Sequence, residues 1–141
     1  MSEENKALVR RTYEEVWNDK NLDVIDEIAA ADAVAHNIPP GFPEGAEGSK
    51  AFIGMYLSAF PDTKMTVEDM IAAGDTVVTR WRATGTHNGE LMGIPPTGKQ
   101  VTVTGIGIDR ISGGKIVESW GEFDALGMMQ QLGVVPMPGQ S

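Results

Sequence analysis

The sequence has no cysteine and few basic residues, and each shortage restricts what the protein can do. Without cysteine in 141 residues, disulfides, thiol nucleophiles and thiolate metal sites are excluded. This composition fits a reducing compartment, so we expect a cytoplasmic protein. There are 11 Lys and Arg against 20 Asp and Glu, giving a net charge of −9. Because a field of this sign repels phosphate groups, nucleic acid is not an expected partner.

Long hydrophobic runs are also lacking. No apolar run approaches the roughly 20 residues of a membrane span, and the polar, charged N-terminal segment is unlike a secretory signal. The two histidines stand far apart, with no H-x-H or H-E-x-x-H spacing, so we do not expect a metal site. The length suits one domain over residues 1–141.

Hydrophobic spacing divides the chain into a helical part and a strand part. Apolar residues recur at helical intervals over 2–18, 22–31 and 49–60. A short strand is predicted over 34–38, between the second and third helices. The period then changes to two, which predicts strands over 65–72, 76–87, 100–111 and 115–123, followed by a short helix over 125–132. The segments 39–48 and 88–99 are rich in Pro and Gly and are predicted as loops.

Helices followed by a separate run of strands indicate the α+β class. Four strands cannot close a barrel, so we expect a strongly curved, mainly antiparallel sheet wrapped around the N-terminal helices. Gly85, Gly105 and Gly107 lie inside predicted strands and would permit that bend or leave room within it. The expected shape is a cone with an internal apolar pocket.

The closing strand and its continuation, KIVESWGEFDALGMMQQLG, suggest an acid–base site. Side chains alternate along a strand, so Trp120, Glu122 and Asp124 share a face. Loss of hydration at an apolar cavity, and repulsion between two carboxylates, would both raise the pKa of Asp124 and suit it to proton transfer. The alternative is structural, because Asp is a preferred N-cap and the helix after Asp124 is followed by Gly133.

Other residues are candidates for walls and donors of the pocket. In the strand 76–87, Trp81 and His87 share one face, whereas Arg80 and Arg82 share the other. His87 is a candidate second proton carrier or oxyanion donor, with a purely structural role as the alternative. The arginine-bearing face is a candidate dimer interface. The candidate apolar walls, for which ordinary core packing is the alternative, are Tyr13, Trp17, Trp81, Trp120 and Met128.

Three segments together resemble the SnoaL-like polyketide (ester) cyclase family: GELMGIPPTGK, RISGGKIVESW and FDALGMMQQLG. The resemblance implies an NTF2-like fold, frequently a dimer or tetramer. It also implies, from the founding cyclases, an intramolecular aldol ring closure that uses neither metal nor organic cofactor. The family's catalytic aspartate corresponds to Asp124, and Asn37 corresponds to an asparagine that lines the family's pocket. In the family's polyketide cyclases a glutamine and a histidine stand where this chain has Gly105 and Gly107, so groups that would bind substrate oxygens are missing and a larger pocket is expected.

The function predicted from these features is cofactor-independent acid–base chemistry on a small, largely apolar, polyketide-like carbonyl compound. Aldol cyclisation and isomerisation both fit, with Asp124 as acid/base and Glu122 beside it. The alternatives are a non-catalytic module for ligand binding or assembly, and a hydrolase or isomerase of other specificity.

The sequence can be compared with the residues that two other enzymes of the same fold class require. An epoxide hydrolase of this type needs Arg and Asp two apart on a strand, but Asp109 and Arg110 are adjacent and should face opposite ways. A site like that of ketosteroid isomerase needs a tyrosine hydroxyl beside a protonated acid. Only Tyr13 and Tyr56 are available, and both are predicted on helices.

Overall fold

The computed structural model describes residues 2–136. The first half of the chain forms α1 (Ser2–Arg11), the π-helical η1 (Thr12–Asn18), η2 (Leu22–Val24), α2 (Ile25–Ile28), β1 (Ala29–Ala35) and α3 (Ala46–Ala59). The second half forms β2 (Lys64–Ala73), β3 (Thr76–Thr86), β4 (Gln100–Ser112), β5 (Lys115–Phe123) and α4 (Ala125–Leu132). Within residues 2–136, none of the helices is long and apolar enough to cross a membrane.

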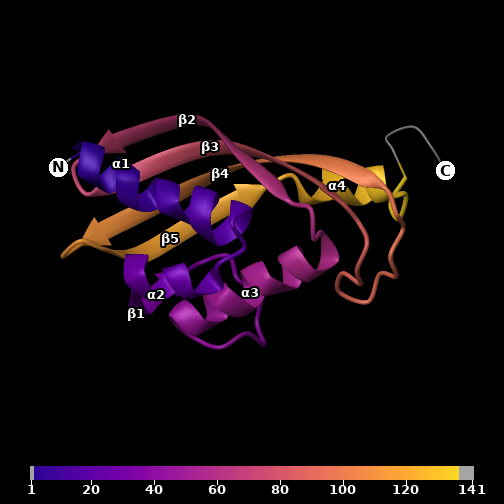
Figure 1. Cartoon of the computed structure of the whole chain (residues 1–141), viewed down its shortest axis with the longest axis horizontal. Helices are drawn as coiled ribbons and strands as arrows, with labels where there is room; N and C mark the ends of the chain where they lie inside the picture. The colour runs from indigo at the N-terminus through magenta and orange to yellow at the C-terminus, as the bar shows by residue number, and fades with distance from the viewer. Residues whose placement is uncertain (1, 137–141) are drawn as a thin grey trace.

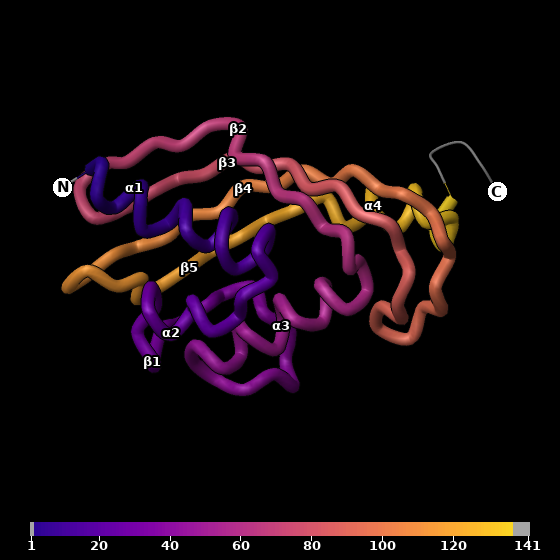
Figure 2. Tube along the Cα trace, viewed as in Figure 1, coloured from indigo at the N-terminus to yellow at the C-terminus, as the bar shows by residue number. Residues whose placement is uncertain are grey.

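A single five-stranded sheet is the framework, with strand order β1-β5-β4-β3-β2. The strands β2 to β5 form the predicted antiparallel meander, and β1 joins β5 in parallel. Figure 1 shows the long strands β2 and β3 bending over α1 and α3, with α4 beyond the end of β5. The Cα trace in Figure 2 shows the same curvature. The predicted α+β cone is therefore confirmed, with an open sheet of five strands.

The predicted bounds around β1 were wrong. A helix was expected to run to residue 31 and a strand to cover 34–38, but Ala29 is already extended (φ −120°, ψ 147°) and the strand covers Ala29–Ala35. Its sequence, AAADAVA, has no apolar alternation that would predict a strand. Pairing with β5 decides the conformation, since Ala29 lies opposite Ile116 and Ala35 opposite Ser119.

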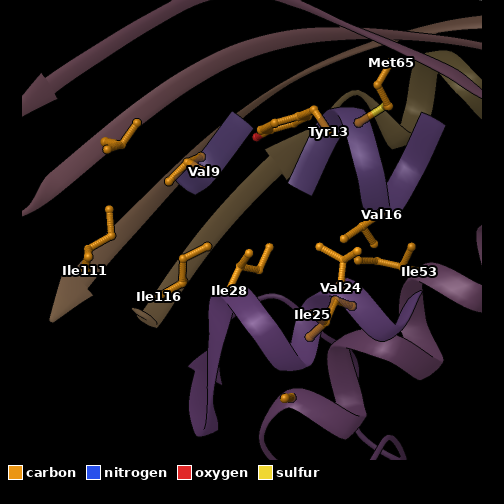
Figure 3. Close-up of a cluster of buried hydrophobic side chains, with 12 residues drawn as sticks. Val9, Tyr13, Val16, Val24, Ile25, Ile28, Ile53, Met65, Ile111 and Ile116 are labelled. Carbon is orange, nitrogen blue, oxygen red and sulfur yellow. The ribbon is translucent and has the colours of Figure 1, made fainter. Parts of the chain in front are cut away.

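The concave face of the sheet is buried by the helices in two clusters. Figure 3 shows the first cluster, which includes Val9 from α1, Tyr13 and Val16 from η1, and Ile111 and Ile116 from the sheet. The second cluster lies near α4 and contains Ala59, Phe60, Leu91, Val101, Val103, Met128 and Leu132. The side chain of Trp81 packs against both clusters.

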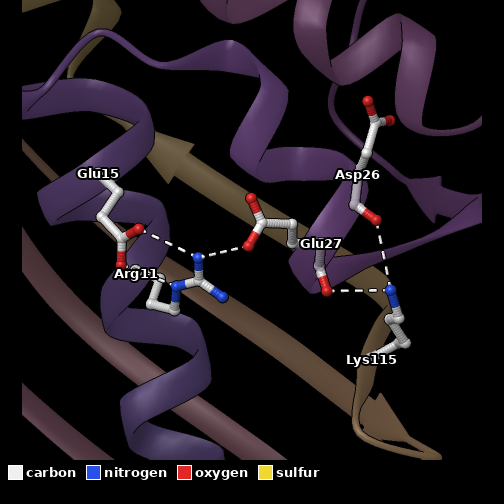
Figure 4. A network of polar contacts seen from close by, with 5 residues as sticks. All are labelled: Arg11, Glu15, Asp26, Glu27 and Lys115. Atoms are coloured by element: carbon white, nitrogen blue, oxygen red, sulfur yellow. Dashed lines mark hydrogen bonds and ion pairs between the residues drawn. The ribbon is translucent and has the colours of Figure 1, made fainter.

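A polar network joins α1 and η1 to α2, and α2 to the start of β5 (Figure 4). The guanidinium of Arg11 pairs with Glu15 at 2.7 Å and with Glu27 at 3.0 Å. The ammonium of Lys115 donates to the carbonyls of Glu27 and Asp26, at 2.9 and 3.3 Å. Exposed pairs of this kind contribute only about 0–1 kcal/mol each, so their main effect is to orient the helix that carries the cavity residues described next.

Candidate functional site

The helices and the concave face of the sheet enclose a cavity of about 280 Å³. This is near the small end of the roughly 300–1,000 Å³ found for small-molecule sites. Most of its lining is apolar, and the aromatic residues of the lining are Tyr13, Trp17, Phe52, Tyr56, Phe60, Trp81, Trp120 and Phe123. Polar side chains line it at a few points, among them Asn37, Asp109 and Ser119.

Asp109 is the acidic side chain on the inner face of this cavity. It lies on β4 opposite Ser119 of β5, and the Ser119 hydroxyl donates to Asp109 Oδ1 at 2.9 Å. Loss of hydration on burial raises the pKa of Asp109 from 3.8 to about 6, and the hydrogen bond from Ser119 only partly opposes the rise. A carboxyl group with such a pKa exchanges its proton close to neutral pH.

Tyr13 reaches the same part of the cavity from η1. The wider turn of this π-helical segment brings Tyr13 and Trp17, four residues apart, to the same lining. Burial raises the pKa of the Tyr13 hydroxyl, and the negative charge of Asp109 raises it further, while the Thr79 hydroxyl acts in the opposite direction. Tyr13 therefore stays protonated at neutral pH and can donate a hydrogen bond to an oxygen in the cavity.

The polar groups at this end of the cavity surround Gly107. The Tyr13 hydroxyl lies 3.0 Å from the place that a Cβ at Gly107 would take, and Thr79 is the cross-strand partner of Gly107. The side chain of Thr79 is fully buried behind the cavity wall, where its hydroxyl lies close enough to Tyr13 to act on its pKa. The Tyr13 hydroxyl is therefore the polar group that lies at the cavity wall beside Gly107.

Asn37 is positioned by the backbone of β5. Its Oδ1 accepts a hydrogen bond of 2.7 Å from the Gly121 amide, which leaves its NH₂ group free to donate. Asn37 lies in the lining of the cavity, where the sequence resemblance had suggested it. It is therefore a second candidate donor, on the side of the cavity formed by the segment after β1.

Asp124 lies outside this cavity. Its Oδ1 accepts a hydrogen bond of 2.9 Å from the Gly127 amide, which makes Asp124 the N-cap of α4. It is exposed and borders a shallow depression with Arg80 and Ile106, on the outer face of the sheet. Since Phe123 is the last residue of β5 and points inward, the next residue is directed away. This placement favours the structural alternative for Asp124 over the catalytic prediction.

His87 also lies outside the cavity lining. It is fully buried, its ring packs 5.3 Å from that of Phe60, and its Nδ1 accepts from the Thr97 amide at 3.2 Å. The Thr97 hydroxyl lies 3.0 Å from the same nitrogen. The last inner-face residue of β3 that reaches the cavity is Gly85. His87 therefore fastens the loop 88–99, which matches the structural alternative for this residue.

The side chains of Trp120 and Glu122 were predicted to face the pocket, but they lie on the outer face of β5. They lie opposite Ile108 and Ile106, and Ile106 is exposed. Trp120 is 39% exposed and stacks on His36 at 4.9 Å. Both residues still border the cavity, because the carbonyl oxygens of Trp120 and Glu122 lie 3.8 and 2.9 Å from the Cβ positions of Gly107 and Gly105, respectively.

A change of register in β5 explains which side chains reach the interior. Ile111 pairs with Ile116, but Arg110 pairs with Glu118, so one extra residue lies between the two pairs on β5. Beyond it, Ser119, Gly121 and Phe123 face the cavity. All five predicted wall residues are part of the cavity lining, namely Tyr13, Trp17, Trp81, Trp120 and Met128.

The expectation that Gly105 and Gly107 enlarge the pocket was wrong. A Cβ at Gly105 would overlap the indole of Trp81, with Cε2 only 2.6 Å away. At Gly107 the Tyr13 hydroxyl occupies the corresponding space. Aromatic side chains from β3 and η1 therefore fill the space above the two glycines.

Asp109 is the candidate site residue that sequence reasoning missed. The signal was present, because Val101, Val103, Gly105, Gly107 and Asp109 alternate along β4 and the first four are buried. An acid in such an apolar set marks a carboxyl group directed inward. Arg110 faces the other way and pairs with Glu118 at 2.9 Å, as the adjacency of Asp109 and Arg110 predicted. Within residues 2–136, no group of three or more His, Asp or Glu is arranged to hold a metal ion.

The fold and cavity define an NTF2-like domain, and solved structures of that class superpose closely. TsrD from Streptomyces laurentii has a TM-score of 0.87 at 27% identity, covering 96% of this chain and 98% of its own. IdmH from Streptomyces antibioticus, described as a candidate polyketide cyclase, has a TM-score of 0.79 at 37% identity, covering 92% and 99%. AclR from Streptomyces galilaeus, described as a candidate hydroxylase, has a TM-score of 0.85 at 29% identity, covering 97% and 89%.

The sequence profile of the SnoaL-like polyketide cyclases matches residues 7–132. The chain therefore belongs to the SnoaL-like polyketide cyclase family. No curated protein matches it.

Proposed function

We propose that this protein catalyses cofactor-independent proton transfer on a small, largely apolar carbonyl compound, with Asp109 as the general acid/base. The observation that carries the proposal is the Asp109 carboxyl group at the wall of an apolar cavity, held by Ser119, with its pKa raised by burial to about 6. A base is most effective when its pKa lies near the working pH. The family and the named relatives make a polyketide-like carbonyl compound the natural substrate class.

The chemistry needs only one acid/base and one oxyanion donor. The Asp109 carboxylate removes a proton from the carbon beside a carbonyl, and the electron pair moves to the carbonyl oxygen to give an enolate. Tyr13 donates its O–H to that oxygen, which stabilises the negative charge. In an aldol closure the enolate carbon attacks a second carbonyl carbon of the same molecule, and Asp109 returns its proton to the new alkoxide. In an isomerisation the proton returns to another carbon.

The remaining polar groups suit the same substrate. Asn37 can donate its NH₂ group to a second carbonyl oxygen, which would hold the two ends of the molecule in the cavity. A site like that of ketosteroid isomerase is less well matched, because it pairs the tyrosine with a second, protonated acid, whereas Asp109 is the base in this proposal. Asp124 serves in this proposal as the cap of α4.

Deuterium exchange in D₂O tests the proposal without knowledge of the native substrate. β-Tetralone, a two-ring ketone with acidic C–H bonds, is incubated with the protein, and incorporation of deuterium is followed by NMR. The exchange rate should rise with pH through about 6 as Asp109 ionises. Asp109→Asn should lower the protein-dependent rate by about 10²–10⁴-fold, as for other general bases, whereas Asp124→Asn should leave it unchanged.

Equal rates for Asp109→Asn and the unaltered protein would overturn the role of Asp109. Loss of exchange in Asp124→Asn alone would restore the prediction made from the sequence. If β-tetralone binds but does not exchange, the non-catalytic binding module becomes the better description. Assembly into a dimer or tetramer, and a cytoplasmic location, stay predictions.

A further inference from the structure

We infer that Trp81 determines which carbonyl compounds the cavity accepts. Its indole limits how far a fused-ring ligand can extend from the polar end of the cavity, and its N–H group donates a hydrogen bond to a ligand oxygen. The inference deepens the proposed function, because it names a substrate class for the same cavity. It is tested by binding alone, so it can fail or hold independently of catalysis by Asp109.

Trp81 has a central position along the sheet. Trp81 lies opposite Gly105, in the middle of the paired stretch of β3 and β4. On one side the next inward pairs are Thr79 with Gly107 and then Val77 with Asp109. On the other side the inward pairs are Ala83 with Val103 and Gly85 with Val101. The indole therefore stands between the end of the cavity at Asp109 and the more apolar end at Val101 and Val103.

Gly105 has no side chain, and the indole of Trp81 occupies the space that this leaves. The six-membered ring of Trp81 lies directly over Gly105, in space that any larger residue would need. The indole also packs against both core clusters, which limits its freedom to swing aside. Trp81, Asp109 and Val103 line the same cavity, so we expect a ligand at Asp109 to meet this ring where it extends toward Val103.

The indole nitrogen of Trp81 is available as a hydrogen-bond donor. Trp81 Nε1 has no hydrogen-bond acceptor among the described residues, although a buried indole N–H usually finds one. Within residues 2–136, the side-chain polar atoms that are both sealed from solvent and without a hydrogen bond of acceptable geometry are Thr79 Oγ1 and His87 Nε2. Trp81 Nε1 is not one of them, so it is not sealed. Since Trp81 lines the cavity, we infer that Nε1 is open to it. A carbonyl oxygen of the ligand is the acceptor that this position lacks.

Three probes separate the two roles of Trp81. β-Tetralone has two rings and a carbonyl, tetralin has the same rings without the carbonyl, and anthrone has three rings and a carbonyl. Dissociation constants are measured by isothermal titration calorimetry for the unaltered protein and for the variants Trp81→Phe and Trp81→Leu. The control is Ile71→Ala, which removes an exposed apolar side chain of β2 that is not part of the cavity lining.

The unaltered protein should prefer β-tetralone to tetralin and should bind anthrone weakly or not at all. Trp81→Phe keeps a ring but loses the donor, so the preference for β-tetralone over tetralin should fall by about 3–10-fold, the value of one hydrogen bond. Trp81→Leu removes the ring system, so affinity for anthrone should rise at least about 10-fold. Ile71→Ala should change neither result.

A full preference for β-tetralone in Trp81→Phe would overturn the donor role. Failure of Trp81→Leu to admit anthrone, in a variant whose circular dichroism shows a folded protein, would overturn the size limit. If Trp81→Leu does not fold, Gly105→Ala replaces it. The added methyl group must displace the indole, so unchanged binding of all three probes by Gly105→Ala would overturn the size limit. Absence of β-tetralone binding to the unaltered protein would overturn the whole inference, whereas binding without deuterium exchange would overturn only the proposed function.

Discussion

The replacement Asp109→Asn should stabilise the protein above pH 6. Burial raises the pKa of Asp109 from 3.8 to about 6, so the folded state resists ionisation of this group. Between these two pH values the folded state holds a proton that the unfolded chain has released, and stability falls as pH rises. A shift of about two pH units corresponds to about 3 kcal/mol. Asn cannot ionise and can still accept the Ser119 hydrogen bond, so this loss should disappear.

The assay is urea unfolding at intervals from pH 4.5 to pH 8 for the unaltered protein and Asp109→Asn. The gain from the replacement should be about 1 kcal/mol at pH 4.5, should grow by about 1.4 kcal/mol per pH unit, and should level off near 3 kcal/mol above about pH 6. Asp69→Asn is the matched control, because it makes the same chemical change at an exposed carboxyl on β2. It should give no pH-dependent gain.

A constant difference between Asp109→Asn and the unaltered protein at every pH would refute the reasoning. It would mean that the Asp109 carboxyl group is as well hydrated in the folded state as in the unfolded chain. The proposed acid–base role would then lose its physical basis, since an ordinary carboxyl group is a weak base at neutral pH. Stabilisation with loss of deuterium exchange would instead be the combination expected for a residue kept for function at a cost in stability.

Three further replacements test the placement of other residues. Asp124→Ala removes the cap of α4 and should lower the free energy of unfolding by about 1 kcal/mol in urea titrations, without lowering the rate of β-tetralone exchange. His87→Ala leaves the Thr97 amide without its acceptor and should destabilise the protein by about 2–4 kcal/mol, with faster proteolysis within residues 88–99. Gly107→Ala places a methyl group 3.0 Å from the Tyr13 hydroxyl and should slow deuterium exchange at least about 10-fold while the variant stays folded by circular dichroism. An unchanged exchange rate in Gly107→Ala would argue against Tyr13 as the oxyanion donor.

The order and type of most elements were predictable because hydrophobic period is a local property. The meander from β2 to β5 follows from alternation along each strand, and Arg80 and Arg82 lie on the outer face as predicted. The strand β1 was not predictable in its observed bounds, since its Ala-rich sequence takes an extended form only through pairing with β5. Local pattern cannot report a partner more than 80 residues away in the chain.

The candidate site shows the same division. The sequence by itself determined the family, the α+β class and the apolar walls. Its alternation along β4 also places Asp109 on the same face as the buried residues of that strand. The tertiary structure decided which acid lies in the cavity, because the extra residue in β5 and the cap of α4 set the direction of Ser119 and Asp124. It also decided that Trp81 and Tyr13 fill the space above Gly105 and Gly107. The pKa of a carboxyl group depends on the water and charges around it in space, and those come from strands and helices that only the folded chain brings together.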